Sequence, residues 1–61
     1  MQLDAIHEAA QKGDAAAQLE LADAFHHGRG VAKNLLEASR WYELAARSGQ
    51  AEAQHKLALL Y

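Results

Sequence analysis

Apolar side chains recur along this chain at intervals of three and four residues, the spacing of an amphipathic α-helix. The pattern predicts four helices, at about residues 2–12, 14–27, 35–48 and 50–61. Alanine occurs 15 times and proline is absent, so strong helix formers dominate and the commonest helix breaker is missing. The predicted fold class is therefore all-α.

Each predicted helix has one face of apolar or small residues that we expect to be buried. The faces of the first three helices comprise Leu3, Ile6, Ala9 and Ala10; then Gln18, Leu21, Ala22 and Phe25; then Ala38, Trp41, Tyr42 and Ala45. The fourth helix repeats the second. Small residues allow helix axes to approach closely, and we expect this role for Ala22, Ala45, Ala46 and Ala58.

Glycines and capping residues mark the predicted helix ends. Gly13 and Gly49 suit the left-handed backbone that often ends a helix, while Asp14 lies near the positive end of the second helix and Asn34 is a good N-cap. The segment "GRGVAKN", residues 28–34, has two glycines that permit a tight reversal. Such short connections make neighbouring helices antiparallel, which predicts a row of αα-hairpins.

The sequence also resembles itself at an offset of 36 residues. Residues 9–25, "AAQKGDAAAQLELADAF", then align with residues 45–61, "AARSGQAEAQHKLALLY", and eight of the 25 overlapping positions are identical. The matches include glycine, glutamine and leucine as well as alanine, and Phe25 aligns with Tyr61. Periods of this length are typical of stacked helical repeats. We therefore expect one whole repeat, at about residues 13–48, flanked by parts of two others.

Length and charge narrow the class of protein. Sixty-one residues are enough for a single domain, spanning 1–61, whose stability is marginal because so short a chain buries a small core. There is no cysteine, so a disulfide framework and a thiolate metal site are both excluded. Six basic and eight acidic residues are scattered along the chain, and no basic stripe is available for a phosphate backbone. Nucleic acid is therefore not an expected partner.

Membrane insertion is also not expected. No window approaches the eighteen or so apolar residues that a membrane span requires. The first ten residues, "MQLDAIHEAA", hold two acids and no Lys or Arg, unlike a secretory signal. A cytoplasmic location follows as the default expectation, unless Met1 replaces a removed leader.

A combined motif runs from Gly13 to Gly49. It consists of Ala17, Leu21, "FHHGRGV" at 25–31, Ala38, "WY" at 41–42 and "AA" at 45–46. This series resembles the Sel1-like repeat, a relative of the tetratricopeptide repeat. The chain departs from the family pattern with Ala22 for Gly, Phe25 for Tyr, Asn34 for Asp and Glu37 for Lys. Ala22 is still small and Asn34 still caps a helix, so the departures leave the expected fold unchanged.

The resemblance implies a right-handed α-solenoid fragment that acts as a non-enzymatic scaffold for protein–protein contact. In such a scaffold the first helix of each repeat lines a concave face. No catalytic residues and no cofactor accompany the family. The residues themselves also favour a non-enzymatic protein, because nothing in the sequence combines a nucleophile, a base and a residue that orients the base.

If the second and fourth helices line the concave face, the side chains next to their buried stripes should be exposed on that face. We define the predicted binding face by the residues that we expect to contact a partner: Leu19, Asp23, His26, His27, Glu52, His55 and Leu59, with Ala16 beside them. A peptide or protein segment with an apolar anchor is the expected ligand. The alternative is that these are ordinary solvated side chains.

The histidines also suggest a metal site. His26, His27 and His55, with Asp23 or Glu52, are ligand types that suit zinc, nickel or copper. Adjacent residues point about 100° apart on a helix, however, so we expect surface histidines near a helix C-terminus and no bound metal.

Three further features have structural interpretations. "GRG" at 28–30 lacks the rest of a phosphate-binding signature and is expected to form a turn. Trp41 and Tyr42 are aromatic residues of the type that stacks on ring ligands, but their place in the repeat predicts a core role. Four further acids form no catalytic pair and are expected to be solvated: Asp14, Glu20, Glu37 and Glu43.

Both end helices expose apolar residues that a partner helix would cover. We define the predicted association ends as Leu3 and Ile6 in the first helix and Leu57, Leu60 and Tyr61 in the last. A stable solenoid normally has about three repeats and polar caps, and this sequence has neither. We therefore expect the chain to self-associate. Two further alternatives are a structural unit whose ends are its function and a piece of a longer repeat array.

Overall fold

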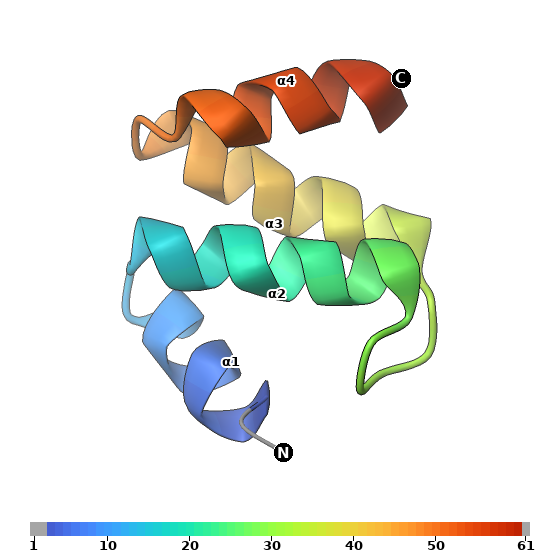
Figure 1. The fold of residues 1–61 in the computed structure, drawn as a ribbon. Coiled ribbons are helices and arrows are strands. Elements are labelled where there is room, and N and C mark those ends of the chain that lie inside the picture. Colours follow the sequence, from blue (N-terminus) through green and yellow to red (C-terminus); the bar gives the residue numbers. More distant parts are fainter. Residues whose placement is uncertain (1–2, 61) are drawn as a thin grey trace.

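The chain folds into four α-helices and no strand within residues 3–60, the part that the computed structural model describes. These are α1 (Leu3–Gln11), α2 (Ala15–His27), α3 (Leu35–Arg47) and α4 (Ala51–Leu60) (Figure 1). The predicted all-α class is confirmed. Helices α2 and α4 begin one residue later than predicted, and α1 and α3 end one residue earlier. The predicted first residue of α1 and the predicted last residue of α4 lie outside the described residues.

Capping interactions fix the predicted helix boundaries. The side chain of Asp14 accepts hydrogen bonds from the backbone N–H groups of Ala16 and Ala17, and that of Asn34 accepts one from Glu37. Both therefore satisfy donors that an α-helix leaves without a partner in its first turn. Gly13 and Gly49, which follow α1 and α3, have φ angles of 101° and 95°. A side chain would strain that backbone, which explains glycine at both places.

The helices pack in chain order, each against the next. Figure 1 shows α3 running back along α2 and α4 running back along α3, whereas α1 crosses α2 at a steep angle. The view of Figure 1 shows α2 and α4 running in the same direction on the near side, with α3 behind and between them. One salt bridge joins α2 to α4 directly, between Asp23 and Lys56. Helices α2 and α4 therefore share one side of α3 and are linked across it by this ion pair.

Alanine makes up most of the buried core. The main cluster joins α2, α3 and α4 and contains five residues with no exposed surface: Ala22, Ala38, Tyr42, Ala45 and Ala53. A second cluster between α1 and α2 contains Ala10, Ala17 and Leu21. Trp41 and Phe25 are partly buried and pack against both clusters. The prediction that Tyr42 is a core residue is confirmed, and Trp41 supports the core from its edge.

Local geometry recurs at the offset of 36 residues. Gln18 Nε2 donates to the carbonyl of Ala10 at 3.0 Å, and Gln54 Nε2 donates to that of Ala46 at 3.3 Å. The backbone N–H groups of residues 14 and 50 donate to the carbonyls of residues 9 and 45, both at 3.1 Å. The predicted equivalence of Phe25 and Tyr61 lies outside the described residues. These two hydrogen bonds of the α1–α2 connection therefore recur in the α3–α4 connection.

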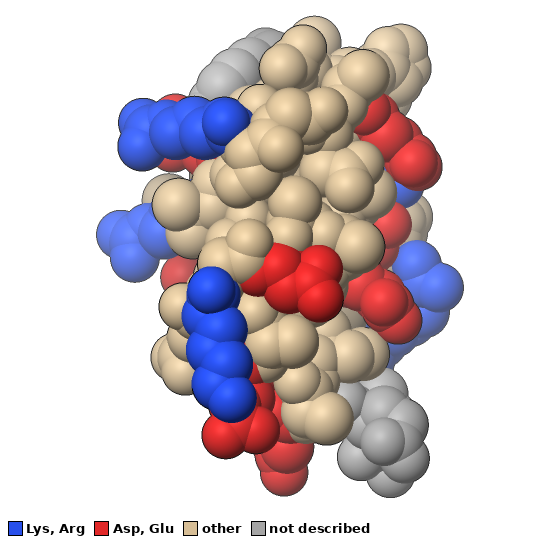
Figure 2. All heavy atoms as spheres, turned by 90° about the vertical axis from the view of Figure 1, so that its left-hand side faces the viewer, with Lys and Arg blue, Asp and Glu red and all other residues tan. Residues whose placement is uncertain are grey.

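The surface carries charges of both signs. Figure 2 shows the end of the molecule that holds the α1–α2 and α3–α4 connections, where acidic and basic side chains are interspersed and no continuous basic stripe crosses the face. Among the described helices, none has the length and apolar character needed to cross a bilayer.

Candidate partner-binding face

The predicted binding face draws on α2 and α4. Helix α2 supplies Leu19, Asp23 and His26, which are half-buried, and the exposed His27; α4 supplies the exposed residues Glu52, His55 and Leu59. Leu19 packs against the main core cluster and offers only part of its side chain to a partner. Leu59 is 71% exposed and is the main free apolar group of this set.

A polar network joins three helices on this face. The Tyr42 hydroxyl of α3 donates a hydrogen bond to Oδ1 of Asp23 in α2, and Lys56 Nζ of α4 donates to the same oxygen at 2.8 Å. Lys56 also lies 3.6 Å from Oε2 of Glu52, one turn earlier in α4. Asp23 therefore links α2 to both α3 and α4 through hydrogen bonds, beside the core cluster that joins the same three helices.

No pattern in the sequence predicted this network. Asp23 was expected on the binding face and Tyr42 only in the core, and Lys56 had no predicted role. One signal was available, because the hydroxyl of a buried tyrosine usually needs a hydrogen-bond partner. The Asp23–Lys56 pair had no such signal, since the two residues lie 33 positions apart in the sequence.

The network shifts the pKa values of all three of its members. Burial alone would raise the pKa of Asp23, but hydrogen bonds from Lys56 and Tyr42, with the nearby positive charge, together hold it below its usual range. Burial, followed by the hydrogen bond to Asp23, raises the pKa of Tyr42 above its ordinary value. The hydrogen bond to Asp23 is also the largest cause that raises the pKa of Lys56. At neutral pH the network thus holds an ionised carboxylate, a neutral hydroxyl and an ammonium group.

We expect the ionisation of Asp23 to make the free energy of unfolding depend on pH in the acid range. Because its pKa is lower in the folded chain than the ordinary value of 3.8, its contribution is complete above 3.8 and is lost as pH falls through the folded value. The free energy of unfolding should therefore differ between the wild type and Asp23→Asn at neutral pH, and the difference should narrow below pH 3.8. Urea titrations followed by circular dichroism at several pH values measure both quantities. A difference that stays constant through the acid range would contradict the network.

His26 and His27 lie closer together than their adjacent positions led us to expect. Their rings stack with centroids 4.5 Å apart and planes at 29°, so these side chains do not diverge. Nδ1 of His26 lies 3.4 Å from the Tyr42 hydroxyl. Asp23, His26 and His27 each offer a ligand atom, and these atoms all lie within 4.8 Å of one another. The third predicted histidine, His55, is exposed on α4.

The predicted association ends are partly covered by the chain itself. Ile6 packs against the second core cluster and Leu57 against the main one. The side chains of Leu3 and Leu60, and Tyr61 as a whole, lie outside the described residues. Within the described part of the chain, α4 packs against α3, and Ala58 is exposed whereas Ala22, its counterpart 36 residues earlier, is fully buried.

The other sequence features take structural roles. Gly28 and Gly30 have φ angles of 71° and 79° in the connection between α2 and α3, as expected for a turn. Three leucines of α3 are also exposed, which the sequence analysis did not single out: Leu35, Leu36 and Leu44. Exposed apolar residues of this kind are common on protein surfaces.

A scan against protein-family models and searches of curated proteins and of solved structures found no match to this chain.

Proposed function

We propose that the chain is a non-enzymatic helical repeat module that binds a peptide or protein segment across the predicted binding face. The observation that supports this most directly is that α2 and α4 run in the same direction on one side of α3 and are joined by the Asp23–Lys56 salt bridge (Figure 1). Two parallel helices backed by a third form a preorganised surface, which lowers the entropy lost on binding.

The repeated hydrogen bonds favour a repeat module of the Sel1-like type. Gln18 and Gln54 tie the start of their own helix to the end of the helix before it, as equivalent residues of stacked repeats do. The sequence resemblance extends the proposal to a right-handed solenoid, and a cytoplasmic location is its default setting.

The chemistry of the face indicates the kind of segment that it would bind. Leu59 presents an apolar side chain, and the partly exposed Leu19 lies on the neighbouring α2. Because Asp23 and Glu52 are both paired with Lys56, the face has little free charge to attract a strongly charged ligand. A segment with an apolar anchor and polar flanks fits this surface best.

The test is a selection of peptides from a random display library on the immobilised chain, followed by fluorescence anisotropy. Leu59→Glu should weaken the selected peptides at least about tenfold, since it places a charge at the apolar contact. Leu36→Glu is the matched control, because Leu36 is 63% exposed but lies on α3. It should leave the affinity within about twofold. Peptides that respond equally to both variants, or a selection that yields none, would rule out the face.

A second candidate is self-association through α4, which the exposed Leu59 and Ala58 favour. An array in which a further helix covers α4 would use the same residues. Sedimentation velocity of the wild type and of Leu59→Glu tests this candidate. A concentration-dependent mass above 6.7 kDa that the variant loses would support it, and a 6.7 kDa species throughout would exclude it.

A further inference from the structure

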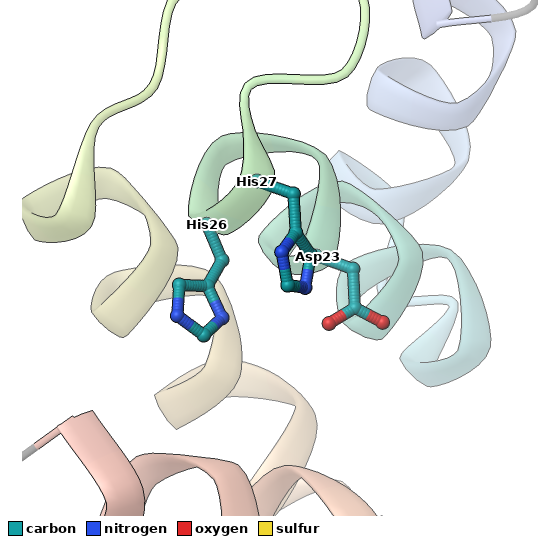
Figure 3. A group of neighbouring side chains, drawn as sticks. All are labelled: Asp23, His26 and His27. Atoms are coloured by element: carbon teal, nitrogen blue, oxygen red, sulfur yellow. The ribbon is translucent and has the colours of Figure 1, made fainter.

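We propose that Asp23, His26 and His27, at the C-terminal end of α2, bind a divalent transition-metal cation of the zinc class. The three side chains project from the last turns of one helix (Figure 3). One carboxylate and two imidazoles are a donor set that suits zinc, nickel or copper. The proposal rests on side-chain positions and is independent of the proposed peptide binding.

The spacing of the three residues brings their ligand atoms near one another. His26 and His27 follow Asp23 by three and four positions, the intervals at which side chains on a helix are neighbours. Their ligand atoms lie within 4.8 Å of one another, whereas a tetrahedral zinc site with bonds of about 2.0–2.1 Å separates its ligands by about 3.3 Å. The stacking shows that the two side chains lie side by side in spite of their adjacent positions. A nitrogen lone pair lies in the plane of its imidazole ring, so one of the stacked rings must turn before both nitrogens can bind the same ion.

The residues around the cluster hold two of the ligands in place. The buried Tyr42 hydroxyl contacts Asp23 and lies 3.4 Å from Nδ1 of His26. The hydrogen bonds from Tyr42 and Lys56 both reach Oδ1 of Asp23, which leaves Oδ2 for the cation. The contacts of the neutral Tyr42 hydroxyl orient its two ligands, as the outer hydrogen bonds of metal sites do, and should raise affinity. Three protein ligands leave a coordination position for water or for a group of a bound partner.

Two charges act on a cation at this position in opposite directions. The C-terminal end of α2 carries the negative end of the helix dipole, which favours a cation. Lys56 repels one, because its ammonium group lies 2.8 Å from Oδ1 of Asp23. Removing that charge should therefore strengthen metal binding, whereas removing a ligand should weaken it.

The experiment titrates the full 61-residue chain with zinc against a chromophoric chelator. We expect one zinc per chain, with affinity reduced at least about tenfold in His27→Gln and Asp23→Asn. His55→Gln, which alters an exposed histidine on α4, is the matched control and should leave the affinity unchanged. Lys56→Gln should tighten binding about fivefold. Equal losses in His27→Gln and His55→Gln, or no saturable binding, would overturn the proposal.

A second measurement does not depend on whether the variants fold. The chain has four histidines, so nuclear magnetic resonance spectra of the imidazole rings distinguish the ligands from the others in the wild type. Zinc should shift the resonances of His26 and His27 and leave those of His7 and His55 in place. Shifts confined to His7 or His55, or spread evenly over all four rings, would refute this site.

Discussion

Replacing Tyr42 with alanine is expected to unfold the chain. Tyr42 has no exposed surface and is the largest fully buried side chain, in a main cluster whose other members are alanines. Truncating a buried aromatic residue costs about 3–5 kcal/mol, because the neighbours cannot fill the cavity. A single core of this size supplies about 3–5 kcal/mol in total. Circular dichroism should show that Tyr42→Ala has lost most of its helix signal under conditions in which the wild type is folded.

Tyr42→Phe separates the ring from the hydroxyl. It keeps the aromatic packing but removes the hydrogen bond to Asp23, which still has Lys56 as a partner. We expect this variant to remain folded and to lose about 1–2 kcal/mol of unfolding free energy in urea titrations. If Tyr42→Phe lost as much unfolding free energy as Tyr42→Ala, the hydroxyl group and not the aromatic ring would make the larger contribution to stability. If Ala left the urea midpoint unchanged, Tyr42 would not be the centre of the core.

The helices and their ends were predictable because local interactions determine them. Asp14 and Asn34 bind backbone groups two or three residues away, and Gly13 and Gly49 adopt the positive φ that ends a helix. The buried stripes were predictable for a similar reason, since helical periodicity alone selects the face that carries Leu21. None of these features requires knowledge of how one helix meets another.

The polar network and the histidine cluster depend on tertiary contacts and on side-chain rotamers. Lys56 reaches Asp23 only because α4 lies on the same side of α3 as α2 does (Figure 1). The rings of His26 and His27 stack although their backbone positions differ by about 100° around the helix. The sequence repeat at an offset of 36 residues predicts that Gln18 and Gln54 are equivalent. It does not predict the polar network or the histidine cluster.

Ala22→Leu is expected to destabilise the chain strongly, whereas Ala58→Leu is not. The two alanines lie 36 residues apart and begin from the same side chain, but Ala22 has no exposed surface and Ala58 is exposed. Ala22 belongs to the main cluster with Ala38, Ala45 and Ala53, all fully buried. Helices that approach through alanine leave no room for a leucine, and overpacking costs about 1–3 kcal/mol or more.

Comparing Ala22→Leu with Ala58→Leu separates the effect of burial from the effect of helix propensity. Both substitutions replace one strong helix former with another, so propensity changes by the same small amount in each helix. The free energy of unfolding measured by urea titration should fall markedly for Ala22→Leu and stay within about 0.5 kcal/mol of the wild type for Ala58→Leu. Equal effects at the two positions would mean that α4 is covered as α2 is, by another copy of the chain. Self-association would then account for the exposed face of α4, and sedimentation of the Ala58→Leu variant would show a smaller mass than that of the wild type.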